Sequence, residues 1–145
     1  MAFIYISNEW FDEVKKRMET DEAYMKKAKG FTVKWCNIIT DCPGGVDKFV
    51  LWEIEGGKPL SLTVEDAEAP SEWRKRPFDA KKYNFRATGS YDTFAKLNKK
   101  ELGVMKAVTV KAYKIDGPMM KLMGMMPKMN SWVDLMAKVP AEYEG

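Results

Sequence analysis

Residues 83–126 read YNFRATGSYDTFAKLNKKELGVMKAVTVKAYKIDGPMMKLMGMM, and this stretch decides the predicted fold. It opens with Tyr83 to Thr88, where apolar and polar side chains alternate as in a half-buried strand. Ser90 can then cap a short helical segment. Residues 108–113 alternate again and predict a second strand, and Gly117-Pro118 opens a methionine-rich helix. Strands around a helix, followed by a methionine-rich helix, indicate a pocket with a flexible wall.

Three more strands are predicted upstream of that stretch. Residues 31–40, 46–55 and 60–65 each alternate between apolar and polar side chains, and Gly56-Gly57 suits the turn between the last two. Before them, residues 7–30 show the apolar spacing of helices. We therefore expect five strands, with helices before and after the first three.

The end of the chain predicts two helices separated by a break. Residues 119–129 hold six of the eleven methionines, and residues 127–130 (PKMN) interrupt the helical pattern. A last helix then follows, with Ser131 and Asp134 spaced as in a capping box. A methionine stripe is typical of ordinary core packing and also of surfaces that adapt to varied apolar partners, so both interpretations stay open.

Length and composition indicate one soluble globular domain over residues 1–145. The chain is 46% hydrophobic and 31% charged, which is ordinary for such a domain. No run approaches the roughly 20 apolar residues needed to span a bilayer. The apolar start at residues 1–6 lacks the basic residues of a secretory signal. We therefore expect a cytoplasmic protein.

The residue types present exclude several kinds of chemistry. The chain has two cysteines, Cys36 and Cys42, and no histidine, so a zinc site and a Ser-His-Asp arrangement are both disfavoured. We expect no metal and no cofactor, and we expect a protein that is not an enzyme. A weaker alternative is an enzyme acting on an acyl ester, with its chemistry at the pocket mouth on one of four residues: Asp92, Lys111, Tyr113 and Asp116.

Charge is distributed unevenly along the chain. Residues 1–70 hold 9 Lys/Arg against 13 Asp/Glu, a balance of −4, whereas residues 71–145 hold 15 against 8, a balance of +7. The long connection at residues 66–82 carries a compact basic cluster: Trp73, Arg74, Lys75 and Arg76. This cluster could contact an anionic membrane or the head group of a ligand such as a coenzyme A ester, or it could simply be solvated. We expect no nucleic-acid partner.

A likeness to a known family is carried by several of these segments: Ile6 to Trp10, Lys29 to Phe31, Tyr91, Phe94, Leu97, Val108 to Tyr113, Asp116-Gly117 and the helix from Pro118. In their order and spacing the sequence resembles the sterol carrier protein type 2 family of lipid-binding domains. The resemblance covers nearly the whole chain. It implies an α/β (α+β) fold, with a five-stranded mixed β-sheet, helices on one face and an apolar tunnel between them.

The same resemblance implies non-enzymatic binding or transfer of a lipid, fatty acyl-CoA, sterol or isoprenoid. Apolar residues of the strands and C-terminal helices are our candidates for the pocket lining: Val50, Trp52, Phe85, Phe94, Leu97, Met105, Val110, Met119, Met120, Met123, Met126, Trp132 and Met136. We expect little discrimination between head groups, because few polar anchors are evident. The alternative is an accessory domain whose methionine-rich helices bind a protein partner or a second copy; the sequence leaves monomer and homodimer open.

Overall fold

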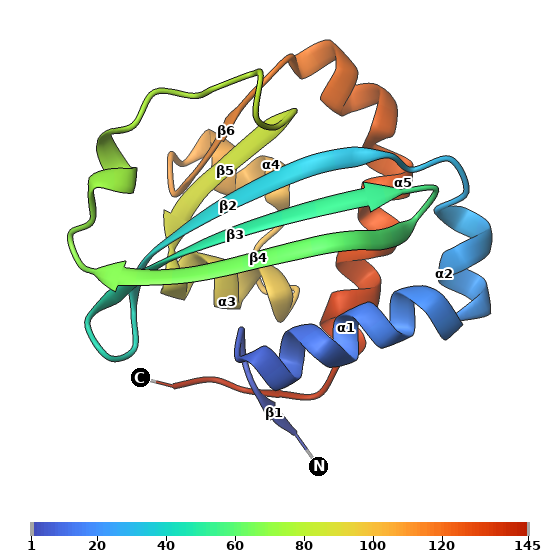
Figure 1. Cartoon of the computed structure of the whole chain (residues 1–145), viewed down its shortest axis with the longest axis horizontal. Coiled ribbons are helices and arrows are strands. Elements are labelled where there is room, and N and C mark those ends of the chain that lie inside the picture. Colours follow the sequence, from blue (N-terminus) through green and yellow to red (C-terminus); the bar gives the residue numbers. More distant parts are fainter. Residues whose placement is uncertain (1, 145) are drawn as a thin grey trace.

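The computed structural model describes residues 2–144, which form a curved sheet with helices on one side (Figure 1). The elements follow in this order along the chain: β1 (Phe3–Ile4), α1 (Asn8–Thr20), α2 (Glu22–Lys27), β2 (Val33–Cys42), β3 (Val46–Glu55), β4 (Lys58–Glu68), the 3₁₀ turn η1 (Glu72–Lys75), β5 (Phe85–Ser90), α3 (Tyr91–Asn98), α4 (Val104–Thr109), β6 (Tyr113–Asp116), α5 (Met119–Lys138) and β7 (Ala141–Glu142).

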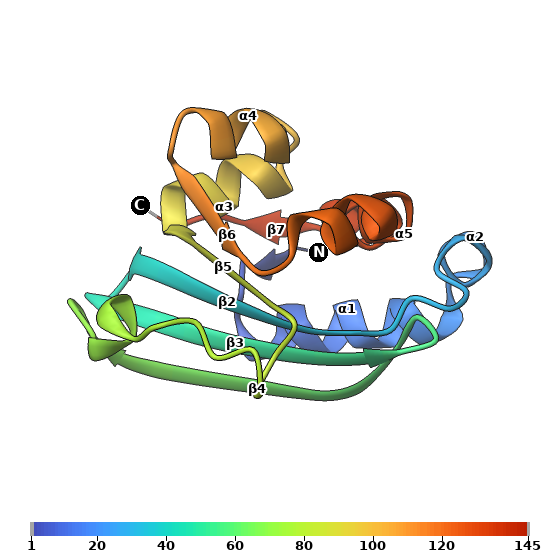
Figure 2. The same ribbon diagram turned by 90° about the horizontal axis from the view of Figure 1, so that it is seen from above.

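The main sheet has five strands in the order β4-β3-β2-β5-β6. The central pair β2 and β5 is parallel and the other neighbours are antiparallel, so the sheet is mixed as predicted. Figure 2 shows the helices gathered over one face, while the connection between β4 and β5 runs along the other side. The predicted fold class is confirmed, although the structure does not show the continuous apolar tunnel that the resemblance implied.

The register of the central strands places large aromatic rings on the face that carries the helices. Trp35 of β2 lies opposite Trp52 of β3 and Phe85 of β5, and all three side chains are buried. On β2, Cys36 and Ile38 point to the other face, because successive side chains alternate along a strand. The concave side of the sheet is therefore an aromatic floor beneath the helices.

The predicted strand at Val108 to Tyr113 is wrong over most of its length. Residues Val104–Thr109 form α4, and the strand β6 begins only at Tyr113. The period-2 alternation misled here because Val104, Ala107 and Val108 also have helical spacing, and Ala107 is fully buried in the helical arrangement. Lys111, at φ 62°, lies in the turn that follows the helix.

The predicted break at residues 127–130 is also wrong. Helix α5 runs without interruption from Met119 to Lys138 and contains Pro127 in its interior, so Ser131 caps nothing. A proline inside a helix removes one backbone donor and strains the preceding turn. Burial of Met129, Trp132 and Leu135 on the following turns offsets that loss by removing apolar area from water.

Caps fix several helix boundaries, among them the predicted one at Ser90. The Ser7 side chain accepts a hydrogen bond from the backbone N–H of Trp10 at 3.2 Å, and that of Ser90 accepts one from Thr93 at 3.1 Å. Gly30 at φ 82° lies just beyond α2, in the left-handed region that favours glycine. The chain then returns to β2, so α1 and α2 are held beside the sheet.

The two ends of the described chain meet under the helices. β1 and β7 pair in parallel, with Phe3 opposite Ala141 and Ile4 opposite Glu142. Tyr5, which follows β1, packs against Tyr143 with ring centroids 4.9 Å apart. This small sheet carries the side chain of Tyr5 to the edge of the space between α1 and α3.

Within residues 2–144, none of the helices combines the length and the apolar character needed to cross a bilayer.

Candidate functional site

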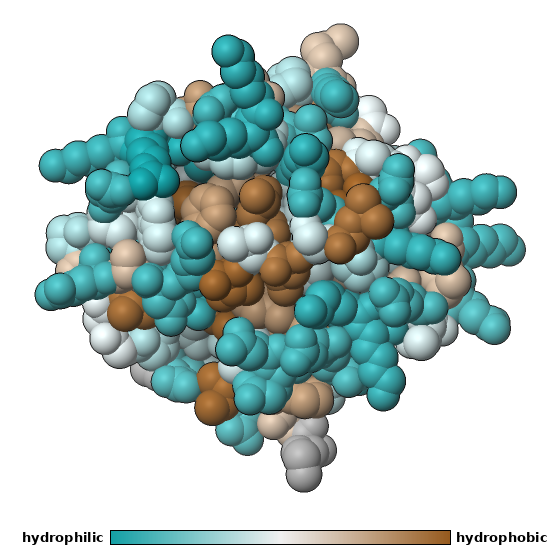
Figure 3. Space-filling view, viewed as in Figure 1, coloured by the Kyte–Doolittle hydropathy of each residue, from teal (hydrophilic) through white to brown (hydrophobic). Residues whose placement is uncertain are grey.

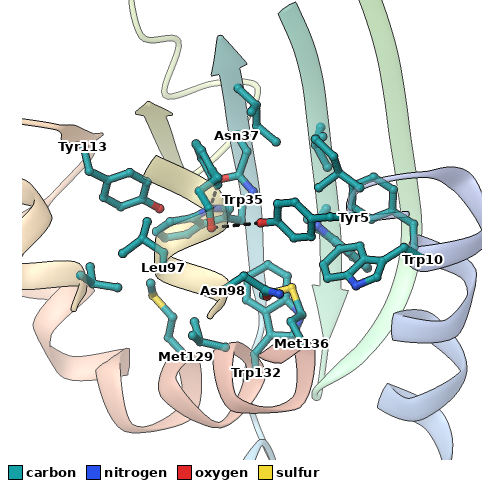
Figure 4. A pocket seen from close by; sticks show the side chains of 18 residues that line it. Tyr5, Trp10, Trp35, Asn37, Leu97, Asn98, Tyr113, Met129, Trp132 and Met136 are labelled. Carbon is teal, nitrogen blue, oxygen red and sulfur yellow. Dashed lines mark hydrogen bonds between the residues drawn. The ribbon is translucent and has the colours of Figure 1, made fainter. Parts of the chain in front are cut away.

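A cavity of about 80 Å³ lies between the concave face of the sheet and helices α1, α3 and α5 (Figure 4). Eighteen residues from β2, β3, β6, the helices and the segment after β1 line it: Tyr5, Ile6, Trp10, Phe11, Trp35, Asn37, Ile39, Val50, Trp52, Phe94, Leu97, Asn98, Val104, Tyr113, Met129, Trp132, Val133 and Met136. A long-chain ligand would therefore require the helices to move outward.

Aromatic rings form the walls at the α1 and α5 side. Trp132 of α5 meets Trp52 of β3 edge to face, with ring centroids 5.4 Å apart, and Phe11 of α1 lies 6.0 Å from Trp52 on the same strand. Such edge-to-face pairs are favoured beyond the area they bury. These walls are rigid and buried, whereas Met129 and Met136 add flexible side chains from α5.

Small residues on β5 make room for rings at the opposite side. Ala87 is fully buried, and a Cβ added to Gly89 would lie 3.3 Å from Cδ1 of Tyr113 and 3.4 Å from Cε2 of Phe94. Tyr113 and Phe94 therefore lie over this strand, packed edge to face at 5.4 Å. A larger residue at position 89 would push against both rings.

Polar groups interrupt the apolar lining at a few points. The Tyr5 hydroxyl donates to the carbonyl oxygen of Phe94 at 3.2 Å, and Trp35 Nε1 donates to Asn37 Oδ1 at 2.8 Å (Figure 4). Asn98 Nδ2 donates to the Tyr143 hydroxyl at 2.7 Å. The cavity therefore has more polar groups than the sequence predicts. Nothing in the sequence pattern marks Tyr5, Asn37 or Asn98 as part of the lining.

The cavity carries no formal charge at neutral pH. Desolvation raises the pKa of both Tyr5 and Tyr113 well above the usual tyrosine range, so both hydroxyls stay protonated. The other lining side chains are apolar, indole-bearing or amide-bearing. Between residues 2 and 144 there is no cluster of three or more His, Cys, Asp or Glu that could hold a metal ion.

The residues considered for an acyl-ester enzyme do not form a constellation. Asp116 pairs with Arg86 at 3.1 Å, and Asp92 pairs with Lys96 one helical turn away. Of the four, Tyr113 alone lines the cavity. Both cysteines are free and buried, and burial raises the pKa of Cys36 to about 12 and that of Cys42 to about 11, so each remains a protonated thiol.

The structure separates the predicted lining residues into three groups. Six line the cavity: Val50, Trp52, Phe94, Leu97, Trp132 and Met136. Two lie in or against the surrounding core, Phe85 being fully buried and Met126 partly buried. Five have exposed side chains away from it: Met105, Val110, Met119, Met120 and Met123.

The exposed methionines correct the picture of a methionine wall. Met120 is 87% exposed and Met123 is 65% exposed, while Leu122 between them is buried. The N-terminal half of α5 thus presents methionine to solvent, and its C-terminal half lines the cavity. The sequence does not reveal this, because its pattern predicts that the methionine-rich helix ends near Pro127.

Twelve residues of the lining are not among the predicted lining residues, although Tyr113 was a candidate at the pocket mouth: Tyr5, Ile6, Trp10, Phe11, Trp35, Asn37, Ile39, Asn98, Val104, Tyr113, Met129 and Val133. Trp10, Phe11 and Trp35 belong to the hydrophobic core and also line the cavity. Trp35 and Asn37 lie directly opposite Trp52 and Val50 on the neighbouring strand, so the register of this strand pair brings them to the same face as two predicted lining residues. No sequence signal points to Tyr5.

The basic cluster lies on the opposite side of the sheet from the cavity. Trp73 packs on Phe49 with centroids 5.7 Å apart, in the small outer cluster with Cys36 and Ile38. Arg74 is held by the carboxylates of Asp41 and Asp47, and Arg76 pairs with Glu72. This placement separates the cluster from any head group bound in the cavity.

Figure 3 shows the face of the sheet that carries this connection, where brown apolar atoms lie among charged side chains. Phe49, Leu51, Trp73 and Phe78 are the partly buried apolar residues around Cys36 and Ile38. The outer face is thus covered only in part by the connection between β4 and β5.

Comparison with known proteins supports the fold and little beyond it. No protein-family model matches the sequence, and no curated protein matches it significantly. Among solved structures, a conserved hypothetical protein from Thermus thermophilus, described as a possible sterol carrier protein, superposes with a TM-score of 0.73 at 14% identity, covering 98% of this chain and 94% of that one.

Two further structures bear the family's name. A sterol carrier protein 2 superposes with a TM-score of 0.68 at 13% identity, covering 93% of this chain and 98% of that one. A sterol carrier protein domain from Helicoverpa armigera gives a TM-score of 0.54 at 16% identity, covering 89% and 86%. The resemblance read from the sequence is confirmed as a sterol carrier protein 2-like fold.

The fold also occurs inside a larger enzyme. A variant of a sec-alkyl sulfatase matches 96% of this chain with a TM-score of 0.51, but the match covers only 17% of that enzyme. The architecture described here, a mixed sheet with a cavity under its helices, is thus that of a sterol carrier-like domain.

Proposed function

We propose that this protein binds and carries a lipid-like apolar molecule in the cavity between the sheet and helices α1, α3 and α5, without chemistry of its own. The cavity itself supports this function most directly, because aromatic and aliphatic side chains line most of it. Burial of apolar surface, at about 25 cal/mol per Å², supplies the affinity of such sites. The sterol carrier-like fold supports the same function, since solved structures of that name share this architecture.

We propose that the ligand enters when α5 moves outward from the sheet. The cavity of about 80 Å³ is too small for a long chain, and α5 contributes four lining residues to it. The same helix carries an internal proline and an exposed first half, which makes it less firmly held than the sheet. Met129 and Met136 can change rotamer to follow ligands of different shape.

Native mass spectrometry of protein purified from its own host tests this function. The expected result is a population carrying an extra mass that is released by organic extraction and proves to be a lipid or other long apolar molecule. Fluorescent fatty acids, acyl-CoAs and sterols should also compete for one site. Absence of any bound mass, together with no binding below about 100 µM, or roughly −5.5 kcal/mol, contradicts the proposal.

An accessory role in protein binding is the second candidate, and the exposed methionines favour it. Met119, Met120 and Met123 lie on the first half of α5 and are 43%, 87% and 65% exposed. Methionine surfaces adapt to different apolar partners. Sedimentation over a range of concentrations separates self-association from a monomeric carrier, because only the former shifts mass with concentration.

A further inference from the structure

The hydroxyl of Tyr113 is a polar group of the cavity that has no hydrogen-bond partner within residues 2–144. Tyr113 is 6% exposed, and its hydroxyl points inward among the other lining side chains (Figure 4). Within the described chain this oxygen makes no hydrogen bond, whereas the Tyr5 hydroxyl donates to a backbone carbonyl. The oxygen is not among the fully enclosed atoms without a partner, so it keeps some accessible surface in the cavity and can form a hydrogen bond with a molecule bound there.

Asn37 offers a second donor in the same cavity. Its Oδ1 accepts from Trp35 Nε1 at 2.8 Å, and because an indole N–H can only donate, this bond fixes which side of the amide is oxygen. The Nδ2 group is left as the free end, without an acceptor in the part of the chain that the structure describes. Both Asn37 and Tyr113 line the cavity (Figure 4).

Two lining tryptophans add further unsatisfied donors. The indole N–H groups of Trp10 and Trp132 are buried and find no acceptor among residues 2–144. Both nitrogens have almost no accessible surface, so a molecule in the cavity would bond them only after the surrounding side chains moved. The lining groups that a bound molecule can reach without such a movement are therefore the Asn37 Nδ2 donor, the Tyr113 hydroxyl, which can donate or accept, and Asn98 Oδ1, an acceptor that has no hydrogen bond within residues 2–144.

The surroundings of these groups suit a neutral oxygen better than an ionised one. None of the eighteen lining residues carries a positive charge. A carboxylate moved from water into such a site loses its hydration and gains no cation, and that penalty far exceeds the cost for a neutral hydroxyl or carbonyl. The cavity therefore discriminates between amphiphiles by charge.

We propose that Tyr113, assisted by Asn37, is the head-group site of this cavity, and that the ligand is a neutral amphiphile bound through a hydroxyl or carbonyl oxygen. This inference rests on the proposed function and specifies the class of ligand for the same site. The ionised forms of fatty acids are disfavoured there. The expectation of little head-group discrimination is replaced by a preference for neutral oxygen over carboxylate.

Matched twelve-carbon ligands test this preference directly. 1-Dodecanol, dodecanoate and 1-chlorododecane are each used to displace a fluorescent lipid probe at about pH 7.5, on the wild-type protein and on Tyr113→Phe, Asn37→Leu and Tyr83→Phe. Tyr83→Phe is the matched control, because it removes a hydroxyl from the small cluster on the outer face of the sheet. The dodecanoate titration is repeated near pH 5, where more of the ligand is the neutral acid.

The wild-type protein is expected to bind dodecanol at least about tenfold more tightly than dodecanoate, and dodecanoate is expected to bind more tightly near pH 5. Tyr113→Phe should weaken dodecanol about three- to tenfold, the range of one neutral hydrogen bond, and leave chlorododecane unchanged. Asn37→Leu should act in the same direction, and Tyr83→Phe should change nothing.

Two results overturn this inference while leaving the proposed function intact. One is dodecanoate binding as tightly as dodecanol at about pH 7.5. The other is a Tyr113→Phe protein that binds all three ligands as the wild type does, which would mean that water alone satisfies the hydroxyl. If displacement occurs with none of the ligands, the proposed function falls and the head-group site with it.

Discussion

Asp47 and Arg74 form a two-point ion pair on the outer side of the sheet. Arg74 Nε lies 2.8 Å from Asp47 Oδ2 and Arg74 Nη2 lies 2.8 Å from Oδ1, while the Asp47 side chain is fully buried. Ser71 adds two hydrogen bonds to the same carboxylate, from its backbone N–H and its hydroxyl. The pair therefore anchors η1 to the start of β3, and the arginine that the sequence offered for membrane contact is structural.

Replacing Arg74 by Gln should lower the free energy of unfolding by about 2–3 kcal/mol, because it leaves the buried Asp47 carboxylate without its cation. The loss should stay below that of a fully buried pair, because the Arg74 side chain is partly exposed. Arg76→Gln is the matched control, since Arg76 pairs with the exposed Glu72 and should cost less than about 0.5 kcal/mol. Urea denaturation measures both. Equal midpoints for the two variants would show that the Asp47 pair does not stabilise the fold.

The same pair predicts how stability depends on pH. The hydrogen bonds and charge of Arg74 hold the pKa of Asp47 well below its usual range. Its contribution is therefore complete above the unfolded pKa of about 3.9 and is lost as pH falls further toward the folded value. The free energy of unfolding should drop more steeply between about pH 5 and pH 2.5 for the wild type than for Asp47→Asn. Parallel curves for the two proteins would exclude Asp47 as the cause.

The strands and caps could be predicted because their signals are local. β3 has the bounds that alternation predicted, and Ser90 caps the helix assigned to it. Residues 104–112 could not be predicted, because their apolar residues fit both periods and only burial of Ala107 against the fold decides for a helix. Pro127 likewise misled, since tertiary packing of the following turns carries α5 through it.

The cavity was harder to predict than the fold. Val50 and Trp52 follow from strand alternation, but the cavity also needs Tyr5, which reaches it through pairing between the two ends of the described chain. Such pairing is non-local and leaves no periodic signal. The exposed half of α5 shows the same difficulty, because the composition of a helix does not say which side meets the sheet.

Filling the cavity should abolish ligand binding without unfolding the protein. Leu97→Trp adds a ring's volume to a space of about 80 Å³, and we expect at least a tenfold loss of affinity for a fluorescent fatty acid with a stability change within about 1.5 kcal/mol. Met120→Trp is the control, because Met120 is 87% exposed. A variant at position 120 that loses binding, beside an unaffected Leu97→Trp, would place the ligand on the exposed methionine surface.

Exchange of ligand with vesicles should depend on basic residues that form no ion pair with any residue from 2 to 144. Lys75, Lys81 and Lys82 lie on the connection between β4 and β5 and are exposed. Each contributes about 1 kcal/mol near an anionic surface, and salt screens this attraction over about 8 Å. Changing all three to Gln should slow transfer to anionic vesicles, leave neutral vesicles unaffected and preserve stability. An unchanged rate at low salt would show that these lysines are simply solvated.

Helix α5 should open in two parts with different stabilities. Residues 119–126 bury only Leu122, and Pro127 removes a backbone donor at the next position, whereas the second half buries Met129, Trp132 and Leu135. Local opening draws on the segments with the fewest buried contacts. Backbone amides of residues 119–126 should therefore exchange with deuterium at least about tenfold faster than those of residues 129–138. A bound ligand should slow exchange in the second half, which lines the cavity.

Pro127→Ala should restore the missing donor and slow exchange of the first half. Gly124→Ala is the control, because it raises helix stability by about 1 kcal/mol without adding a donor. Uniform protection along α5 in the free protein, unchanged by ligand, would show that the helix is fixed core and that the ligand enters elsewhere.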